Sequence, residues 1–165
     1  MRDIIGKDKK LCYIRKAVFF KSYLLLYIHD MEGIIELFIN WTKKKIQYHV
    51  NKEKKGLFFH QGQVWWAALG QNIGFEMDGK NEEFHRPVLI LKKYNAKMCF
   101  VVPLTTKMKH PPVWYHVSVP GGDRPRVANI TQGRTISSKR LLRKESTLEK
   151  KYLEVVSRAF KKQFI

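Results

Sequence analysis

The stretch PVLILKKYNAKMCFVVPL, residues 87–104, decides the fold class of this chain. Two apolar runs, 87–91 and 98–104, flank the polar tetrapeptide YNAK at 94–97. Short runs rich in Val, Ile and Leu are typical of buried strands, and the polar connection favours a turn between them. The sequence therefore predicts two strands joined by a turn, with Pro87 at the first strand position, where proline is tolerated.

Further strands are predicted on both sides of this pair. Residues 64–67, 114–119 and 127–130 each form a short apolar run, and PGGD at 120–123 predicts a tight hairpin turn between the last two. Residues 70–85 form a long polar loop. Short strands joined by turns, without alternating helices, indicate a mainly β fold, a small antiparallel barrel.

The end of the chain is predicted to be a helix. Ser146 or Thr147 is expected to cap its start, with Glu149 in the first turn. One helical face carries the apolar residues Leu148, Tyr152, Val155, Val156, Ala159, Phe160 and Phe164.

Residues 1–55 differ from the rest because they contain no proline and have long aliphatic runs. The apolar spacing from Ile34 to Trp41 predicts a helix, and residues 43–55 read as a solvated linker. We expect a basic helical extension over 1–55 and a separate domain over 56–165. Because Met31 stands where the helix begins, residues 1–30 are hypothesised to be an upstream extension created by a misplaced start.

The charge of the chain favours a polyanionic partner. Among 165 residues, 32 are Lys or Arg and 14 are Asp or Glu, a formal net charge of +18. A hydrophobic share of 44% excludes a purely disordered basic tail. Two cysteines indicate a reducing cytoplasm, and the apolar run 17–28 is shorter than the roughly 20 residues of a membrane helix. We therefore expect a cytoplasmic protein without a membrane segment.

Motifs for cofactor or metal chemistry are not found in the sequence. There is no Gly-x-x-x-x-Gly-Lys-Ser/Thr loop, no Gly-x-Gly-x-x-Gly and no Gly-x-Ser-x-Gly. The six histidines are scattered, and Cys12 and Cys99 lie far apart. No cofactor and no metal site are predicted.

Four segments, in order, carry a family resemblance. They are GQVWWAALG at 62–70, GFE at 74–76 leading to RPVLI at 86–90, FVVPLTTK at 100–107, and QGRTISSKRL at 132–141. Together they resemble the MazF/PemK family of toxin endoribonucleases, over about residues 60–160.

This resemblance implies an SH3-like barrel with a C-terminal helix, usually a homodimer. It implies metal-independent cleavage of single-stranded RNA, in which the 2′-hydroxyl attacks the scissile phosphate and leaves a 2′,3′-cyclic phosphate and a 5′-hydroxyl. It also implies a type II toxin held in check by an acidic antitoxin, with operator DNA bound only by the toxin–antitoxin complex. Two alternatives are a gyrase-inhibiting barrel related to CcdB and a non-catalytic DNA- or RNA-binding barrel.

The resemblance places the catalytic role on Arg86, with Thr105 and Thr106 beside it. A guanidinium suits this role because it is permanently charged and makes two parallel hydrogen bonds to a phosphate. The alternative role for Arg86 is a surface ion pair with a neighbouring acid. Since arginine cannot accept a proton at neutral pH, Glu76 and His85 are the candidates for a general base.

RNA binding is predicted for a basic stretch that includes aromatic residues. Nine Lys and Arg stand against one acid, Asp123, between residues 107 and 144. Basic groups and stacking rings suit single-stranded RNA, although such a stretch is also typical of a plain solvated face. The candidates are Lys107, Lys109, Trp114, Gln132 and Arg134.

Two family positions differ in this chain. Some PemK-type members carry a His before the loop Glu and an Arg-x-Asp before the Gln-x-Arg-Thr segment. Phe75 and residues 129–131 stand there instead. For Arg134, a structural role in the barrel is the alternative to contact with RNA.

Overall fold

The structure, a computed structural model, describes residues 31–52, 56–108, 113–121 and 124–164. The chain divides into two compact units, one ending at Thr42 and the other beginning at Lys43. The hypotheses about the apolar run 17–28 and about a misplaced start fall on residues outside the described ones.

Residues 31–50 are helical, which confirms the helix predicted around Ile34 to Trp41. The prediction of a linker from residue 43 was wrong for residues 43–50, which continue the same helix. The reason is that residues 34–52 contain neither glycine nor proline, so no residue there ends a helix.

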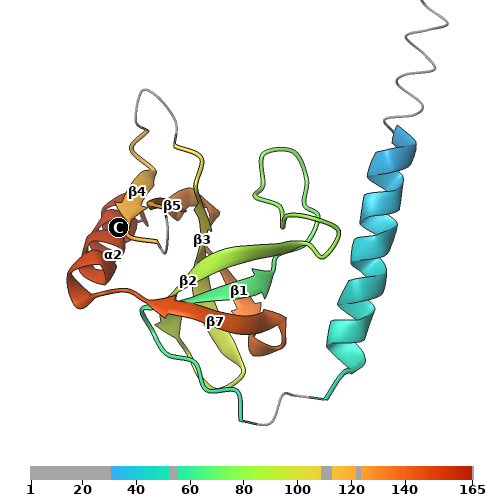
Figure 1. The fold of residues 1–165 in the computed structure, drawn as a ribbon, viewed down its shortest axis with the longest axis horizontal. Helices are drawn as coiled ribbons and strands as arrows, with labels where there is room; N and C mark the ends of the chain where they lie inside the picture. The colour runs from blue at the N-terminus through green and yellow to red at the C-terminus, as the bar shows by residue number, and fades with distance from the viewer. Residues whose placement is uncertain (1–30, 53–55, 109–112, 122–123, 165) are drawn as a thin grey trace, which may run out of the picture. The chain divides into compact units, whose positions relative to one another are not determined.

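A seven-stranded sheet follows, and all its strand pairs are antiparallel. The strands run in the order β4-β5-β3-β2-β1-β7, with β6 paired to β3 beside this path (Figure 1). The mainly β fold class with flanking helices is therefore confirmed. The elements are β1 Gln63–Ala68, β2 His85–Lys93, β3 Met98–Thr105, β4 His116–Val119, β5 Arg126–Asn129, η1 Ile130–Gln132, β6 Arg134–Ser137, η2 Ser138–Arg140, β7 Leu141–Thr147 and α2 Lys150–Phe164.

The continuous apolar run of β2 is explained by burial of both faces of the strand. Val88 and Ile90 belong to one core cluster with Trp65, while Leu89 and Leu91 belong to a second cluster that includes Val156 of α2. Since successive side chains point to opposite faces of a strand, a strand covered on both sides cannot alternate apolar with polar residues.

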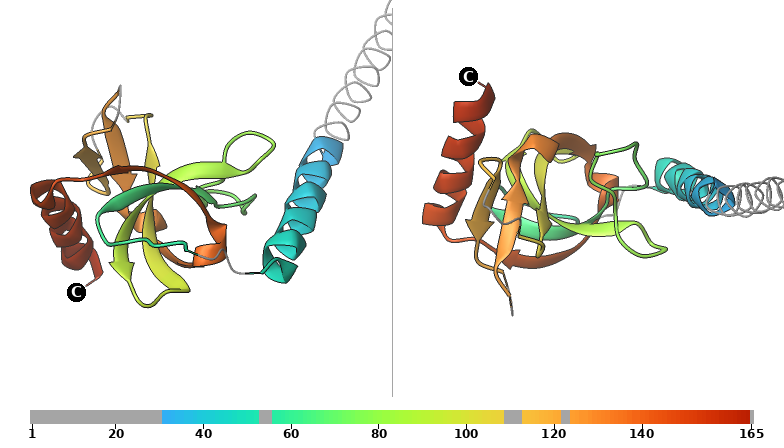
Figure 2. Two further views of the ribbon diagram at one scale, coloured as in Figure 1. Left: turned by 60° about the horizontal axis from the view of Figure 1, so that its bottom comes forward. Right: turned by 90° about the horizontal axis from the view of Figure 1, so that it is seen from above.

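The sheet curls, but its two edge strands do not pair among the described residues. Instead, an ion pair joins β5 to β7: Arg126 Nη1 and Nη2 donate to the two Glu145 carboxylate oxygens, each at 2.5 Å. Both side chains are largely shielded from solvent. A bidentate Arg–carboxylate pair of this kind is stronger than one with a single hydrogen bond. The barrel expected from the sequence is thus a curled, open sheet (Figure 2).

Two strands, β6 and β7, were missed by the sequence analysis. Both strands contain few apolar residues, and β7 pairs only with β1 at the edge of the sheet. The predicted capping role of Ser146 or Thr147 was wrong, because these residues pair with Val64 and Gln63 in the sheet and α2 begins at Lys150. Pro87 lies third in β2 rather than first, since the strand starts at His85.

Helix α2 packs through one face against the second core cluster. Val156 is fully buried there, and Tyr152, Ala159 and Phe160 pack against the same cluster. Val155 was expected on this face but is 48% exposed, because one residue along a helix turns the side chain by about 100°. Leu148, the first residue of the predicted face, is also buried, and the side chain of Phe164 lies outside the described part of the structure.

Val155 and Val156 offer a matched pair of substitutions. Val156→Ala should lower the free energy of unfolding by about 1–3 kcal/mol because it removes buried methyl groups and leaves a void. Val155→Ala should change it by less than about 0.5 kcal/mol, as expected for a half-exposed site. Chemical denaturation followed by circular dichroism measures both, and equal effects of the two variants would contradict the packing described for α2.

Candidate functional site

A cavity of about 730 Å³ lies in the β-rich unit, where β3 ends. Loop 70–84, β2, β3, β4 and the β5–η1 connection all contribute to it. Its lining residues are Phe75, Met77, Lys80, Arg86, Thr105, Lys107, Met108, Tyr115, His116, Asn129, Thr131 and Gln132. The cavity thus brings together four predicted site residues that are far apart in the sequence, with 46 positions between the first and the last. They are Arg86, Thr105, Lys107 and Gln132.

Arg86 is held at the start of β2 by a tight turn. Asn81 and Phe84 adopt positive φ angles of 58° and 56°, and Lys80 and His85 exchange main-chain hydrogen bonds of 2.8 and 3.1 Å. The Phe84 side chain is fully buried and its carbonyl accepts from Leu69 N at 3.0 Å. The buried Phe84 side chain therefore stabilises the strained turn, and the turn positions Arg86 at the cavity.

The Arg86 side chain is 9% exposed, and its Nε donates to the main-chain carbonyl of Asp78. Burial lowers the pKa of the Arg86 guanidinium, and the Asp78 carboxylate raises it in part. Because the guanidinium is the most basic of the side-chain groups, Arg86 stays charged at neutral pH. Arg86 is thus a buried cation, and the predicted surface ion pair is not its described environment.

Loop 70–84 folds back on itself around Asp78. The Asp78 carboxylate accepts from Asn72 N at 2.6 Å, and Asn72 Nδ2 donates to Met77 O at 3.0 Å. Gly79 is required here, because a Cβ at this position would lie 1.9 Å from the Phe84 carbonyl oxygen. The loop that carries the Asp78 carbonyl therefore has a defined shape.

Gln132 and Arg134 fasten this loop to the sheet. Gln132 Oε1 accepts from Met77 N at 2.9 Å, and its Nε2 donates to Phe75 O at 3.3 Å. Arg134 Nη1 donates to Asn72 Oδ1 at 3.1 Å, and Nη2 to Leu69 O at 2.7 Å. Gln132 also lines the cavity, whereas Arg134 lies behind the loop and not among the lining residues.

Thr105 is the last residue of β3 and lies in the cavity wall. It is 8% exposed, and its hydroxyl oxygen accepts from Lys107 N at 3.1 Å. This bond turns the chain so that Lys107 also lines the cavity. Thr106 follows the strand, is exposed, and is not among the lining residues.

Three other predicted site residues, Glu76, His85 and Trp114, are not among those that line the cavity. Glu76 is exposed and accepts from Ile73 N at 3.3 Å within its own turn. His85 Nε2 lies 3.8 Å from a Glu83 carboxylate oxygen. Trp114 is 71% exposed and meets the Tyr115 ring edge to face, and Lys109 falls outside the described residues.

Eight of the twelve lining residues were not among the predicted site residues, and His116 and Asn129 are two of them. His116 on β4 pairs with Asn129 on β5, and the Asn129 side chain accepts from Thr131 Oγ1 at 2.8 Å. The available signal was the departure from the family pattern at residues 129–131. His116 gave none, because only the pairing of β4 with β5 brings it to this wall.

The charge of the lining is entirely basic. Lys80, Arg86 and Lys107 contribute cations, and no Asp or Glu is among the residues that line the cavity. Polar groups beside them, Thr105, Asn129 and Gln132, are able to orient a ligand through hydrogen bonds. Such a lining suits an anion such as a phosphodiester.

Other chemistries find less support within the described residues. No group of three or more His, Cys, Asp or Glu side chains is placed there to hold a metal ion. Cys99 is buried, and burial raises the pKa of its thiol to about 11, so the nucleophilic thiolate is scarce at neutral pH. No helix in this described part has both the length and the apolar character of a membrane span.

Residues 60–164 match the family described as PemK-like, MazF-like toxin of type II toxin-antitoxin system. The chain belongs to this family. The family match covers the β-rich sheet, the cavity and α2, and leaves out the helix at residues 31–50. The resemblance stated from four sequence motifs is therefore confirmed.

A solved MazF structure shares this fold, and two further solved structures resemble the chain less closely. MazF from Deinococcus radiodurans has a TM-score of 0.53 at 20% identity, covering 63% of this chain and 94% of its own. Toxin MazF-mt6 of Mycobacterium tuberculosis has a TM-score of 0.46 at 21% identity, covering 62% and 95%. An endoribonuclease of a mycobacterial species, solved with its cognate antitoxin, has 0.46 at 16% identity, covering 63% and 92%. No curated relative matches the chain.

The contacts of Arg134 predict a supporting role in this PemK/MazF chain. Arg134→Lys should raise the rate of proteolysis within residues 71–83 about tenfold, because a lysine cannot bridge Leu69 O and Asn72 Oδ1 together. Limited proteolysis with mass mapping measures this rate. Arg158→Lys on the exposed face of α2 is the control, and a loop equally resistant in both variants would refute the role.

Proposed function

We propose that this toxin is an endoribonuclease that cleaves single-stranded RNA at selected sequences. The observation that carries the proposal is the cavity itself, which a buried guanidinium and a strand-end hydroxyl line together and whose charged lining residues are all cations. Family membership supports the same activity, and one structural relative is described as an endoribonuclease.

Arg86 would stabilise the reacting phosphate. When the 2′-hydroxyl oxygen attacks phosphorus, the bond to the 5′ oxygen breaks, and negative charge grows on the non-bridging oxygens. A guanidinium fixed by its Nε bond to Asp78 O presents its remaining N–H donors without further reorganisation. The products are a 2′,3′-cyclic phosphate and a 5′-hydroxyl, and in this proposal the cationic charge comes from Arg86, so no metal ion is needed.

Thr105 and Lys107 would bind the phosphate next to Arg86. The Thr105 hydroxyl accepts from Lys107 N, which leaves its own proton for a phosphate oxygen. Gln132 and Tyr115 lie on the same wall and offer an amide and a ring to a base. Lys109, Trp114 and Thr106 remain candidates for contacts with the flanking strand.

His116 is our candidate for the general base. It lines the cavity, unlike Glu76 and His85, and imidazole titrates in the range where a proton is both accepted and returned. His116 would take the proton of the 2′-hydroxyl and give a proton to the departing 5′ oxygen, so the reaction consumes no net proton.

The proposal includes the partners expected for such a toxin. An acidic antitoxin would cover the basic cavity and exclude RNA, in keeping with a chain of net charge +18. One relative is described in complex with its cognate antitoxin. We propose a cytoplasmic homodimer that contacts operator DNA only together with this antitoxin.

Replacing Arg86 tests the catalytic role. Arg86→Ala should lower the cleavage rate of a mixed single-stranded RNA in EDTA by about 10²–10³-fold, because the main donor to the phosphate is lost. Arg158→Ala on α2 makes the same change of charge on an exposed surface and should leave the rate unchanged. Mapping of RNA ends measures the products. Undiminished cleavage by a folded Arg86→Ala protein would defeat the assignment.

Replacing His116 tests the general base. His116→Gln should lower kcat by about 10²–10⁴-fold and remove the fall in kcat at acid pH, since a protonated imidazole cannot accept the 2′-hydroxyl proton. The charged groups that share the cavity wall are Lys80, Arg86 and Lys107. His60→Gln at an exposed position is the control. An acidic limb that persists in the His116→Gln profile would assign it to another group.

A further inference from the structure

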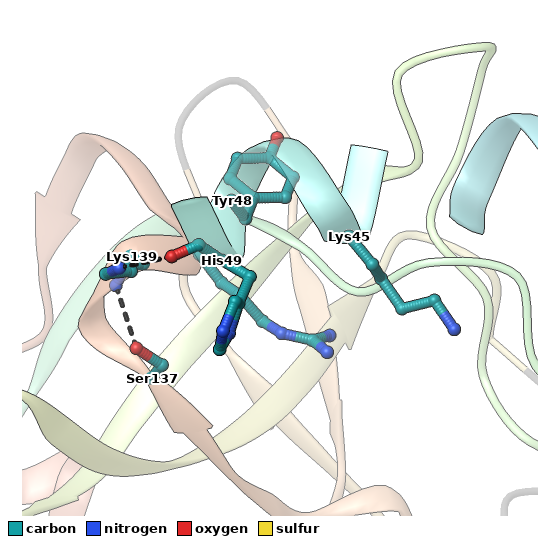
Figure 3. A pocket seen from close by; sticks show the side chains of 6 residues that line it. Lys45, Tyr48, His49, Ser137 and Lys139 are labelled. Atoms are coloured by element: carbon teal, nitrogen blue, oxygen red, sulfur yellow. Dashed lines mark hydrogen bonds between the residues drawn. The ribbon is translucent and has the colours of Figure 1, made fainter. Parts of the chain in front are cut away.

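A second, smaller pocket lies away from the reaction cavity, within the unit that begins at Lys43. Its volume is about 200 Å³. Lys45, Tyr48 and His49 come from the helical segment 43–50, and Ser137, Lys139 and Arg140 come from the end of β6 and from η2 (Figure 3). No lining residue is shared with the cavity that contains Arg86.

The pocket concentrates positive charge. Lys45, Lys139 and Arg140 are among its six lining residues, and neither Asp nor Glu is. The neighbouring Lys44 is paired with Glu83 at 2.5 Å, whereas Lys45 and Lys139 have no carboxylate partner within the described part of the chain. The acids of this region are therefore used outside the pocket, and the lysines that line it keep their charge for a ligand.

The donors of this pocket are held in place by main-chain contacts. Lys139 Nζ donates to His49 O at 2.8 Å, and Lys139 N donates to Ser137 Oγ at 3.3 Å. Arg140 Nη1 donates to Ala68 O at 3.3 Å and is further fixed by Leu69 O at 3.5 Å. A guanidinium fixed by one nitrogen keeps its other N–H groups in a set direction.

Burial strengthens the preference for an anion. Burial lowers the pKa of the Arg140 guanidinium, because the charged form loses its contact with water. A negatively charged ligand beside it would stabilise that charged form. Burial also raises the pKa of the Tyr48 phenol, which keeps it protonated as a hydrogen-bond donor. The lining thus contains two lysines and one guanidinium, with a phenol ring, a serine hydroxyl and an imidazole beside them.

We propose that this pocket binds a phosphate group. Three cationic side chains and no acid line this one pocket, which suits a phosphate because Lys and Arg bind phosphate oxygens through charge-assisted hydrogen bonds. If the proposed ribonuclease function holds, the phosphate is one from the RNA strand that continues beyond the cavity. A free phosphate is the other source of the same chemistry. The helix outside the family match would then supply half of an auxiliary anchor for the substrate.

The first experiment measures binding without cleavage. The probe is a fluorescent 2′-O-methyl RNA of mixed sequence, which cannot react because it lacks a free 2′-hydroxyl. Anisotropy titrations from low to high KCl give the slope of log K against log salt. Lys45→Gln/Lys139→Gln should reduce this slope by about 0.7, since each phosphate contact in a single strand contributes about 0.7 and the pocket holds one phosphate. The control Lys161→Gln/Lys162→Gln on α2 removes the same charge from an exposed surface and should leave the slope unchanged.

The second experiment uses inorganic phosphate. At ionic strength matched with NaCl, phosphate should raise the melting temperature of the wild type more than that of Lys45→Gln/Lys139→Gln, because only the wild type binds it in this pocket as well as in the cavity with Arg86. A response in this arm alone assigns the pocket to free phosphate, and a response in the RNA arm assigns it to the strand. The proposal is overturned if neither arm responds, or if the α2 control changes the RNA slope equally.

These outcomes are separate from the proposed catalysis. Cleavage of RNA by a protein whose pocket variants behave as the wild type overturns the phosphate site alone. A slope reduced by the pocket variants, in a protein that never cleaves RNA, overturns the ribonuclease function alone.

Discussion

A guanidinium removed from water needs acceptors for its N–H groups, and at Arg86 the acceptor is the main-chain carbonyl of Asp78. This one bond joins the start of β2 to loop 70–84. The loop can offer that carbonyl only in a closed shape, which Gly79 permits and the Asp78 carboxylate stabilises. Arg134 and Gln132 then fix the loop to the sheet from the far side. The cavity wall is therefore a consequence of satisfying one buried cation.

Acidic and basic side chains are unevenly distributed over the β-rich unit. The acids of the region are committed elsewhere: Glu145 to Arg126, Glu83 to Lys44, and Asp78 to the loop backbone. The charged residues that line the cavity and the smaller pocket are all cations. In the low-dielectric setting of a partly buried site, such cations attract an anion more strongly than exposed lysines do. The net charge of +18 supports approach of a polyanion, and the two hollows are the places where we propose that it binds.

Most of the sheet could be predicted because its strands are short apolar runs bounded by turns. The runs at 87–91 and 98–104 became β2 and β3, and the motif resemblance led to the correct family. Strands β6 and β7 could not be found this way, because their residues are mostly polar and their β structure comes from partners, β3 and β1. The helix cap was misplaced for the same reason: Ser146 and Thr147 belong to the edge strand that pairs with β1, and their own sequence does not indicate this pairing.

For the candidate site, local sequence determined the residue types at each end of β2 and β3. Pro87 restricts the backbone before it, and the buried apolar runs place Arg86 and Thr105 at strand ends that neighbour each other in the sheet. Tertiary structure decided the rest. Only the pairing of β4 with β5 brings His116 and Asn129 to the wall, and only the closed loop turns Gln132 towards it. Apolar periodicity is a local property that a sequence displays directly. The meeting of polar side chains from four separate segments depends on long-range pairing, which no local pattern encodes.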